Sequence, residues 1–244
     1  HRVRRAALET RGGVACRDAG GGLTVRSSAQ VPFRTRRALA DLFDLPPDKV
    51  RVFCERVGGG FGGKQEMFVE DILALAALKT GRPVKLELTR EEQFIATSTR
   101  HPMRVMVKAG ADKNGKLTAL QLDVLSDTGA YGNHAGPVLF HAVGECLGVY
   151  NCPNKKVDGI AAYTNTVPSG AFRGYGLAQT LIAVEAAIDA LALQPGLSPY
   201  AMRRRNILKP GDPMLSPPDN RYPDLFYGSH ALSQCLPLAY TPVL

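Results

Sequence analysis

The run Gly58–Gly63, five glycines and one phenylalanine, constrains the fold more than any other feature of this sequence. An alternating segment at Val50–Val57 precedes the run, and Gln65–Lys79 follows it with apolar residues at helical spacing. A strand that enters a glycine turn and then a helix is a geometry in which main-chain N–H groups and a helix N-terminus can hold an anion. The sequence therefore predicts a strand–loop–helix unit with a candidate anion-binding loop.

Three interpretations of this loop follow from its residues. Gly58–Lys64 fits the GxxxxGK pattern of a P-loop, but Gln65 stands where that loop needs a Ser or Thr hydroxyl for magnesium. The same residues fit the GxGxxG pattern of dinucleotide-binding folds. No acidic strand end lies about twenty residues later, because Thr89–Glu91 comes too late. In the third interpretation the glycines only let two chain segments cross closely. The loop alone leaves close crossing and the binding of some other anion both open.

The rest of the sequence alternates between strand and helix periodicity, which predicts an α+β (mixed α/β) fold. The strongest local signal is a hairpin that turns at Asn114-Gly115 between alternating apolar residues at 105–109 and 120–124. In the helix predicted at Gln65–Lys79, the apolar residues at helical spacing are Phe68, Ile72, Leu75 and Ala76. Further strands are predicted at Leu23–Ser28, Val84–Thr89 and Gly159–Tyr163. Further helices are predicted at Phe33–Phe43, Gln179–Leu193 and Pro199–Arg205. The first of these helices has Leu39, Leu42 and Phe43 on one face, and Ser198 is the predicted N-cap of the last.

Composition bounds the class of protein. With 244 residues, 45% of them apolar, the chain can bury a core and form one large or two small domains. Its apolar stretches are too short to span a membrane and no secretory pattern opens it, so we expect a cytoplasmic protein without a membrane partner. The five cysteines form no CxxC pair, which argues against a zinc ribbon, an iron–sulfur module or a disulfide scaffold. Because the sequence begins at His1 and not at Met, we expect a fragment or a trimmed subunit.

The formal net charge of +8 raises the alternative of a basic nucleic-acid-binding module. Arginines cluster at Arg2–Arg5, Arg34–Arg37 and Arg203–Arg205. No aromatic platform accompanies these clusters, and solvated helix faces or subunit contacts account for most such clusters. We therefore expect no nucleic-acid partner.

Two segments together resemble the molybdenum hydroxylases, the family of xanthine dehydrogenase and aldehyde oxidase. They are Gly58–Lys64, which reads GGGFGGK, and Thr164–Gly176, which reads TNTVPSGAFRGYG. The likeness extends to Ser28-Ala29-Gln30, Thr80–Pro83, Arg100-His101-Pro102 and Arg203–Asn206, and so covers the chain to about Pro213. It implies that residues 1–213 form the first molybdenum-cofactor-binding domain, which is the first half of the molybdenum region. Residues 214–244 are then expected to be an extended connector or the truncated start of the second half.

The resemblance also implies the site residues. Gln30 matches a glutamine whose amide bonds the molybdenum oxo group, and the main chain around Phe61 and Phe172 matches segments that face the cofactor. The cofactor-binding residues implied in this way are Gln30, Gly60, Phe61, Gly62, Phe172 and Arg173, and the substrate-binding residues are Gln65, His141 and Tyr175. Without the family, Gln30 would be an ordinary polar residue at a strand end, Phe61 a core residue, and Arg173 a partner in a structural ion pair.

The activity implied is that of an oxidoreductase that inserts a water-derived oxygen at an electron-poor carbon. The cofactor implied is molybdenum-molybdopterin, with the cytosine dinucleotide form as one option. The pterin dithiolene holds the metal, so no direct metal ligand is expected here. The catalytic glutamate is expected in the second half, so no catalytic residue is assigned to this chain. Iron–sulfur clusters and FAD are expected on other modules of a hetero-oligomer.

The substrate expectation rests on two departures from the purine-oxidising members of the family. Gln65 replaces a glutamate that contacts the substrate ring, and His141 falls at or near the purine-binding arginine. Xanthine is therefore doubtful, and the resemblance favours nicotinate-like or other N-heterocycles, or aldehydes. Two other interpretations stay open: a truncated, non-catalytic fragment of such a subunit, and a hydrolase using Ser169 with His134 or His141, although no GxSxG elbow is present.

One acidic group receives a structural interpretation. Glu66, Glu70 and Asp71 stand together at the start of the predicted helix. A helix dipole favours acids at that end, so the sequence predicts capping rather than catalysis for these carboxylates.

Overall fold

The computed structural model describes residues 3–212 and 228–240. The chain divides into two compact units, each described by itself below. Unit 1 comprises His1–Pro102, Thr128–Ala135 and Tyr163–Arg173, and unit 2 comprises Met103–Asp127, Gly136–Ala162 and Gly174–Leu244. The architecture is α+β, as the sequence predicts.

Unit 1 is built on a four-stranded sheet in the order β3-β2-β1-β4. Its strands are β1 (Gly12–Arg17), β2 (Leu23–Ser27), β3 (Val50–Phe53) and β4 (Val84–Glu87). β1 runs antiparallel to β2 and β4, whereas β2 and β3 are parallel. The helices are α1 (Pro32–Leu42), the short 3-10 turn Pro47–Lys49, α2 (Glu70–Thr80) and α3 (Arg90–Ala96).

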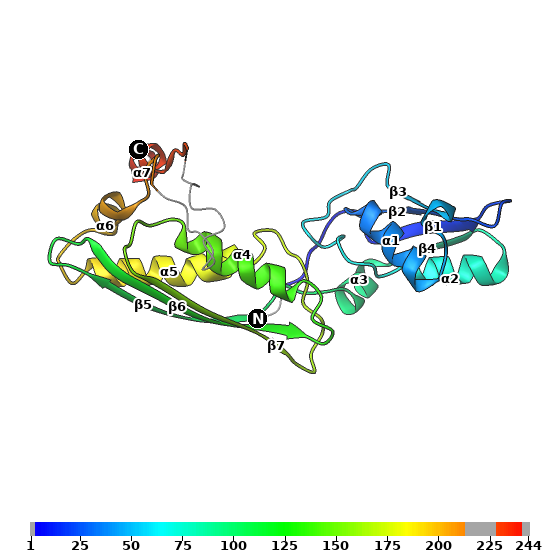
Figure 1. The fold of residues 1–244 in the computed structure, drawn as a ribbon, viewed down its shortest axis with the longest axis horizontal. Helices are drawn as coiled ribbons and strands as arrows, with labels where there is room; N and C mark the ends of the chain where they lie inside the picture. The colour runs from blue at the N-terminus through cyan, green and yellow to red at the C-terminus, as the bar shows by residue number, and fades with distance from the viewer. Residues whose placement is uncertain (1–2, 213–227, 241–244) are drawn as a thin grey trace. The chain divides into compact units, whose positions relative to one another are not determined.

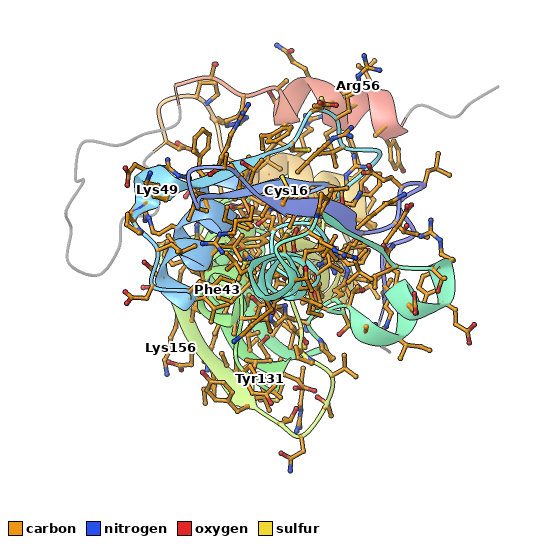
Figure 2. The ribbon with its side chains drawn as sticks, turned by 90° about the vertical axis from the view of Figure 1, so that its right-hand side faces the viewer. Cys16, Phe43, Lys49, Arg56, Tyr131 and Lys156 are labelled. Atoms are coloured by element: carbon orange, nitrogen blue, oxygen red, sulfur yellow. The ribbon has the colours of Figure 1, made fainter. Side chains whose placement is uncertain are left out.

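Helices α1 and α2 pack on this sheet (Figure 1) and enclose the core of unit 1. The fully buried apolar residues of this core are Ala15, Leu23, Val25, Leu39, Ala40, Val50, Val69, Leu73, Ala74 and Ala77. Figure 2 shows how densely side chains fill this part of the molecule, with Cys16 of β1 and Phe43 after α1 labelled. The alternation in β2, where Leu23, Val25 and Ser27 are buried, is the pattern of a strand with one face on a core.

The segment around the glycine loop is less regular than its prediction. β3 ends at Phe53 rather than Val57, and α2 begins at Glu70 rather than Gln65. The glycine loop therefore does not lead directly into a helix N-terminus. An anion at this loop therefore gains nothing from a helix N-terminus.

The prediction of which face of α2 is buried, the face with Ile72 and Leu75, is wrong. Its buried side chains are Glu70, Leu73, Ala74 and Ala77. Ile72 and Leu75 are instead 56% and 47% exposed. The small alanines let α2 lie close to the sheet: a Cβ on Gly13 of β1 would lie 3.0 Å from Leu73 Cδ1. On α1, Leu39 is buried as predicted but Leu42 is 57% exposed.

Unit 2 is built on a three-stranded sheet in the order β5-β6-β7, with β5 (Met103–Ala111), β6 (Leu117–Gly129) and β7 (Lys155–Tyr163). The predicted hairpin is confirmed, with Val105 paired to Val124 and Val107 to Leu122. Gly115 takes φ +75°, the left-handed conformation that an Asn-Gly turn requires. Helices α4 (Ala135–Leu147), α5 (Leu177–Ala192), α6 (Pro199–Asn206) and α7 (Leu232–Tyr240) complete the unit (Figure 1).

The predicted cap of α6 is confirmed, because the Ser198 side chain accepts a hydrogen bond from Ala201 N. At the other end of the helix, Asn206 accepts from Leu117 N at 2.8 Å and donates to Gly115 O at 2.7 Å. These bonds tie α6 to the hairpin turn. Around this point the core of unit 2 contains Leu120, Leu122, Val124, Tyr150, Val184, Ile188 and Met202.

Three elements lie outside the prediction. β1 and α3 are absent from it, although Thr89 and Glu92 form a complete capping box at the start of α3. The sequence also predicts no helix where α4 lies. In the expected connector the structure places α7, while residues 214–227 and 241–244 of that segment lie outside the described residues, and the boundary at 213 stays a prediction. Among the described residues, none of the helices is long and apolar enough to cross a bilayer.

Candidate functional site

The two sequence motifs meet in unit 1, although they lie far apart in the sequence. The main-chain N–H of Arg173 donates to the carbonyl oxygen of Phe61 at 3.0 Å. A Cβ on Gly62 would lie 2.9 Å from the carbonyl carbon and oxygen of Ala171. The glycine loop and the 171–173 segment thus touch through their main chains. We call the surface formed by Gly60, Phe61, Gly62, Phe172 and Arg173 the cradle.

The cradle presents unpaired main-chain donors. Phe61 and Gly62 take φ +53° and +84°, so a left-handed pair interrupts the loop. Within the described part of the chain, the N–H groups of Gly60, Phe61, Gly62 and Phe172 donate to no protein acceptor. Consecutive free N–H groups in such a conformation form a concave site for an electronegative ligand atom. The Phe61 ring is 48% exposed, so it is not the core residue of the alternative interpretation.

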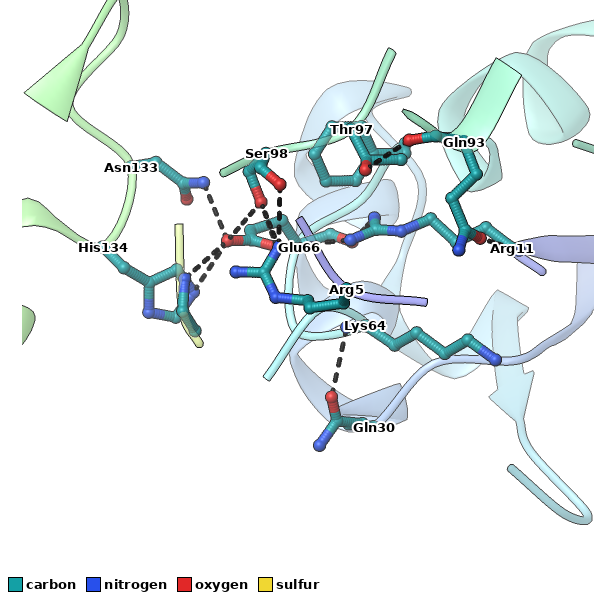
Figure 3. Close-up of polar contacts among 12 residues, drawn as sticks. Arg5, Arg11, Gln30, Lys64, Glu66, Gln93, Thr97, Ser98, Asn133 and His134 are labelled. Atoms are coloured by element: carbon teal, nitrogen blue, oxygen red, sulfur yellow. Dashed lines mark hydrogen bonds and ion pairs between the residues drawn. The ribbon is translucent and has the colours of Figure 1, made fainter. Parts of the chain in front are cut away.

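Gln30 lies against the glycine loop, two residues before α1 begins. Its Oε1 accepts from Lys64 N at 3.1 Å and its main-chain N donates to Lys64 O at 2.8 Å. Because the carbonyl end is held, the amide Nε2 points away from Lys64 (Figure 3), and no described residue accepts a bond from it. A Cβ on Gly60 would overlap the Gln30 carboxamide, so a side chain at that position would displace Gln30 from the loop.

Cations surround the Phe172 ring. The guanidinium of Arg100 lies 3.8 Å from the ring centroid and that of Arg5 lies 4.9 Å from it. Arg100 Nη2 also donates to Arg173 O at 3.0 Å. The Arg173 side chain is exposed and forms no ion pair with any described residue, so the alternative of a structural ion pair is not supported.

Arg5 is buried beneath the cradle. Its Nη1 donates to the carbonyl oxygen and the hydroxyl of Ser98 at 2.9 and 3.1 Å. Burial lowers the pKa of Arg5 to about 10, against the opposing charge of Glu66. Its Nε and Nη2 are buried without an acceptor among the described residues, and such orphaned donors mark a place where a further acceptor is expected.

Glu66 is a buried carboxylate that the sequence assigned to capping, and for Glu66 that interpretation is wrong. Its side chain is 7% exposed and lies before α2 begins. It accepts from Ala171 N at 3.1 Å and from Asn133 Nδ2 at 3.0 Å (Figure 3). Glu70 does fill the capping role, since it accepts from Phe68 N and Val69 N at 3.1 and 3.2 Å.

His134 stands beside Glu66, with its Nε2 3.9 Å from Glu66 Oε1. Burial lowers the pKa of His134, Glu66 raises it, and Arg34 and Arg5 lower it further. Ser169, the nucleophile of the hydrolase alternative, is fully buried and out of reach of a substrate. The residues missed by sequence reasoning are Ser98, Asn133 and the central carboxylate of Glu66, and their contacts join segments that no local pattern relates.

Of the three expected substrate residues, Gln65 lies in unit 1, and His141 and Tyr175 lie in unit 2. In unit 1, Gln65 lines a pocket of about 440 Å³, and the pocket walls also include Arg34, Met67, Phe68, Tyr131, His134 and Pro168. In unit 2, the Tyr175 and His141 rings pack edge to face with centroids 5.3 Å apart. His141 also pairs with Glu145 one turn along α4. The three residues Gly174, Tyr175 and Gly176 all have positive φ, which turns the chain sharply into α5.

The free N–H groups of the cradle are suited to holding an electronegative ligand through the main chain. The chain belongs to the molybdopterin cofactor-binding domain family, whose sequence profile matches residues 1–207. It is 41% identical over 214 residues to a probable xanthine dehydrogenase subunit of Bacillus subtilis, covering 88% of this chain and 28% of that protein. It is 40% identical over 206 residues to the nicotinate dehydrogenase large molybdopterin subunit of Eubacterium barkeri, covering 84% of this chain and 48% of that protein.

Solved structures agree with the family. The aldehyde oxidoreductase of Desulfovibrio gigas superposes with a TM-score of 0.87 at 30% identity, over 97% of this chain and 25% of that one. Quinoline 2-oxidoreductase of Pseudomonas putida 86 gives a TM-score of 0.82 at 29% identity, over 97% of this chain and 30% of that one. The chain therefore spans about a quarter to a half of the length of these relatives.

Proposed function

We propose that this chain forms one wall of the active site in a molybdenum hydroxylase of the xanthine dehydrogenase and aldehyde oxidase type. The reaction proposed is insertion of a water-derived oxygen at an electron-poor carbon of an N-heterocycle or an aldehyde. The observation that carries the proposal is the cradle, in which the free N–H groups of the glycine loop lie beside that of Phe172. When bound, the molybdopterin cofactor would supply the metal centre that accepts two electrons from the substrate.

The residues of the cradle fit such a group. The N–H groups of Gly60, Phe61 and Gly62 would donate to electronegative atoms of the cofactor at close range. The Gln30 amide is already oriented by Lys64 and would donate to the same group. The exposed guanidinium of Arg173 suits a phosphate of the pterin, in the plain or the cytosine dinucleotide form. In this arrangement the protein positions the cofactor and the pterin dithiolene holds the metal.

On the substrate side, Gln65 is proposed to contact the substrate from the wall of its pocket. The pocket combines apolar walls at Phe68 and Pro168 with one cation, Arg34, which forms no ion pair with any described residue, and with the carboxylate of Glu66. Aromatic N-heterocycles suit these walls, and Arg34 is the group that would pair with a carboxylate on such a ring. In unit 2, His141 and Tyr175, whose rings pack edge to face, are also proposed to contact the substrate. The similarity to a nicotinate dehydrogenase subunit supports this class of substrate, and the equal similarity to a probable xanthine dehydrogenase subunit gives it no preference over a purine.

The remaining parts of the enzyme are proposed to lie elsewhere, since the chain spans only part of its relatives. They are the second half of the molybdenum region with the catalytic glutamate, and modules that carry iron–sulfur clusters and FAD. The relatives are named as subunits, which supports a hetero-oligomer.

Molybdenum content tests the proposal. The enzyme assembled with the other subunits encoded beside this chain is measured by mass spectrometry, as wild type, as Gly60→Ala and as Gly136→Ala. A Cβ at Gly60 displaces the Gln30 carboxamide, whereas a Cβ at Gly136 meets open space, and neither glycine has positive φ. We expect near-stoichiometric metal in wild type and Gly136→Ala, and a clear loss in Gly60→Ala. An assembled wild type without molybdenum would mean a non-catalytic fragment, and equal metal in both variants would remove the cradle from the site.

A further inference from the structure

The carboxylate of Glu66 is the point where four separate chain segments of unit 1 converge. It accepts hydrogen bonds from the main-chain N–H of Ala171, from Asn133 Nδ2 and, at 3.4 Å, from Ser98 Oγ. Arg11 Nη2 lies 3.6 Å from Glu66 Oε2. All of these partners donate. An ionised carboxylate, which can only accept, therefore matches this set of groups.

The contact with the 170–171 peptide is close enough to fix its position. A Cβ on Gly170 would overlap both Glu66 Oε1 and the Ser98 side chain. The Gly170 N–H donates to Thr99 O at 2.9 Å, and the next N–H, that of Ala171, donates to Glu66. The peptide that leads into Phe172 and Arg173 is thus held by two successive hydrogen bonds.

Position along the chain makes Glu66 suitable for a functional role. It follows Gln65, which lines the pocket, and its partner Ala171 precedes the cradle residues Phe172 and Arg173. A shift of the carboxylate would therefore move the cradle main chain. Glu70 is just as buried but does not contact Ala171, because it bonds Ser27 Oγ, Phe68 N and Val69 N.

We propose that Glu66 is a positioning residue that, through the Ala171 N–H, holds the 171–173 segment of the cradle in place for the cofactor. The proposal rests on the proposed function for the identity of the cofactor. The hydrogen-bonding role in the protein itself does not depend on that identity. Supporting groups of this kind behind a metal site typically change affinity or activity by about 10- to 100-fold when they are removed.

The test compares Glu66→Gln with Glu70→Gln, the same substitution at a buried carboxylate four residues further along the chain. The bonds from Ala171 and Asn133 both go to Glu66 Oε1. In Glu66→Gln, the amide either turns its NH2 group toward these donors and loses both bonds, or keeps them at a neutral and weaker acceptor oxygen and places the NH2 group against the Arg11 guanidinium. Glu66→Asp serves as a second variant, because it keeps the charge beside Arg11 but withdraws the carboxylate by one methylene. Hydrogen exchange of a peptide covering residues 168–174 is measured on each assembled enzyme, together with molybdenum content, kcat per bound metal and KM.

We expect both Glu66 variants to exchange faster at 168–174, with about a 10-fold or larger fall in metal content or in kcat per metal. Glu70→Gln should speed exchange near residues 68–72 and leave metal content and kcat per metal unchanged. A folded Glu66 variant with wild-type exchange at 168–174 and wild-type metal content would overturn the proposal. If the wild type itself holds no molybdenum, the proposed function fails, and the exchange data still decide whether Glu66 fixes this segment.

Discussion

Replacing Gly62 with alanine tests the contact between the two motifs through stability alone. Gly62 takes φ +84°, and a Cβ there would lie 2.9 Å from the carbonyl carbon and oxygen of Ala171. Gly81, which ends α2, takes φ +65° with nothing within 4 Å of its Cβ. Gly81→Ala therefore carries the backbone strain without the collision and is the matched control.

The expected difference follows from the two contributions. A left-handed conformation costs a residue with a Cβ about 1–2 kcal/mol, and this cost applies to both variants. In Gly62→Ala the loop must also move several tenths of an ångström away from Ala171, which breaks the hydrogen bond from Arg173 N to Phe61 O. The loss of that bond contributes about 1 kcal/mol. We expect Gly62→Ala to lose about 2–3 kcal/mol and Gly81→Ala about 1–2 kcal/mol.

Thermal unfolding measures this difference. For a chain of this size, 1 kcal/mol corresponds to a Tm shift of about 2–4 °C, so Gly62→Ala should melt about that much below Gly81→Ala. Hydrogen exchange of the 168–174 peptide reports whether the extra loss lies at the contact. Equal Tm shifts in the two variants would refute the reasoning, because the collision with Ala171 would then cost nothing.

Two further predictions concern buried polar groups. Tyr150→Phe removes the hydroxyl that donates to both Glu185 oxygens at 2.8 and 2.9 Å. It should cost about 1.5 kcal/mol, the low end for a bond to a charged group, because Glu185 also pairs with Arg203. Urea unfolding against the exposed-site control Tyr163→Phe measures this, and equal midpoints would contradict it. For His134, the pKa lies below its ordinary 6.5 in the folded chain, mainly through burial. The folded state then binds fewer protons than the unfolded state, so stability should be complete above about pH 6.5 and should fall as the pH drops through the folded pKa. His134→Gln should flatten the dependence of the urea midpoint between pH 7 and pH 5, and an unchanged slope would count against this explanation.

Local chemistry made the hairpin and the α6 cap predictable. Asn114-Gly115 needs only its own backbone conformation and the alternation of its flanks, and Ser198 needs only the N–H of Ala201. The buried face of α2 was not predictable in this way, because it depends on how closely the sheet approaches. Gly13 of β1 leaves room for Leu73, and Ile72, which has the same size but is on the other face of the helix, is exposed.

The role of Glu66 was also beyond local reasoning. Its donors come from residues near 11, 98, 133 and 171, which only the folded chain brings together. An acid just before a helix matches the signature of a cap, and Glu70 carries that role instead. The role of Glu66 could have been predicted only with the knowledge that Gly170 and Ala171 pack against its side chain.

The structure also joins two interpretations of the glycine loop that the sequence left open. Gly62 is required because the 171–173 segment crosses the loop at contact distance, and a side chain at position 60 would displace the Gln30 carboxamide. These are the demands of close crossing. Where the segments cross, the Phe61 carbonyl oxygen accepts a hydrogen bond from Arg173 N. The N–H groups of Gly60, Phe61 and Gly62 have no acceptor among the described residues. Close packing on one side of the loop is thus what orients its free donors on the other, so loss of the packing and loss of the cofactor should go together in every variant of this contact.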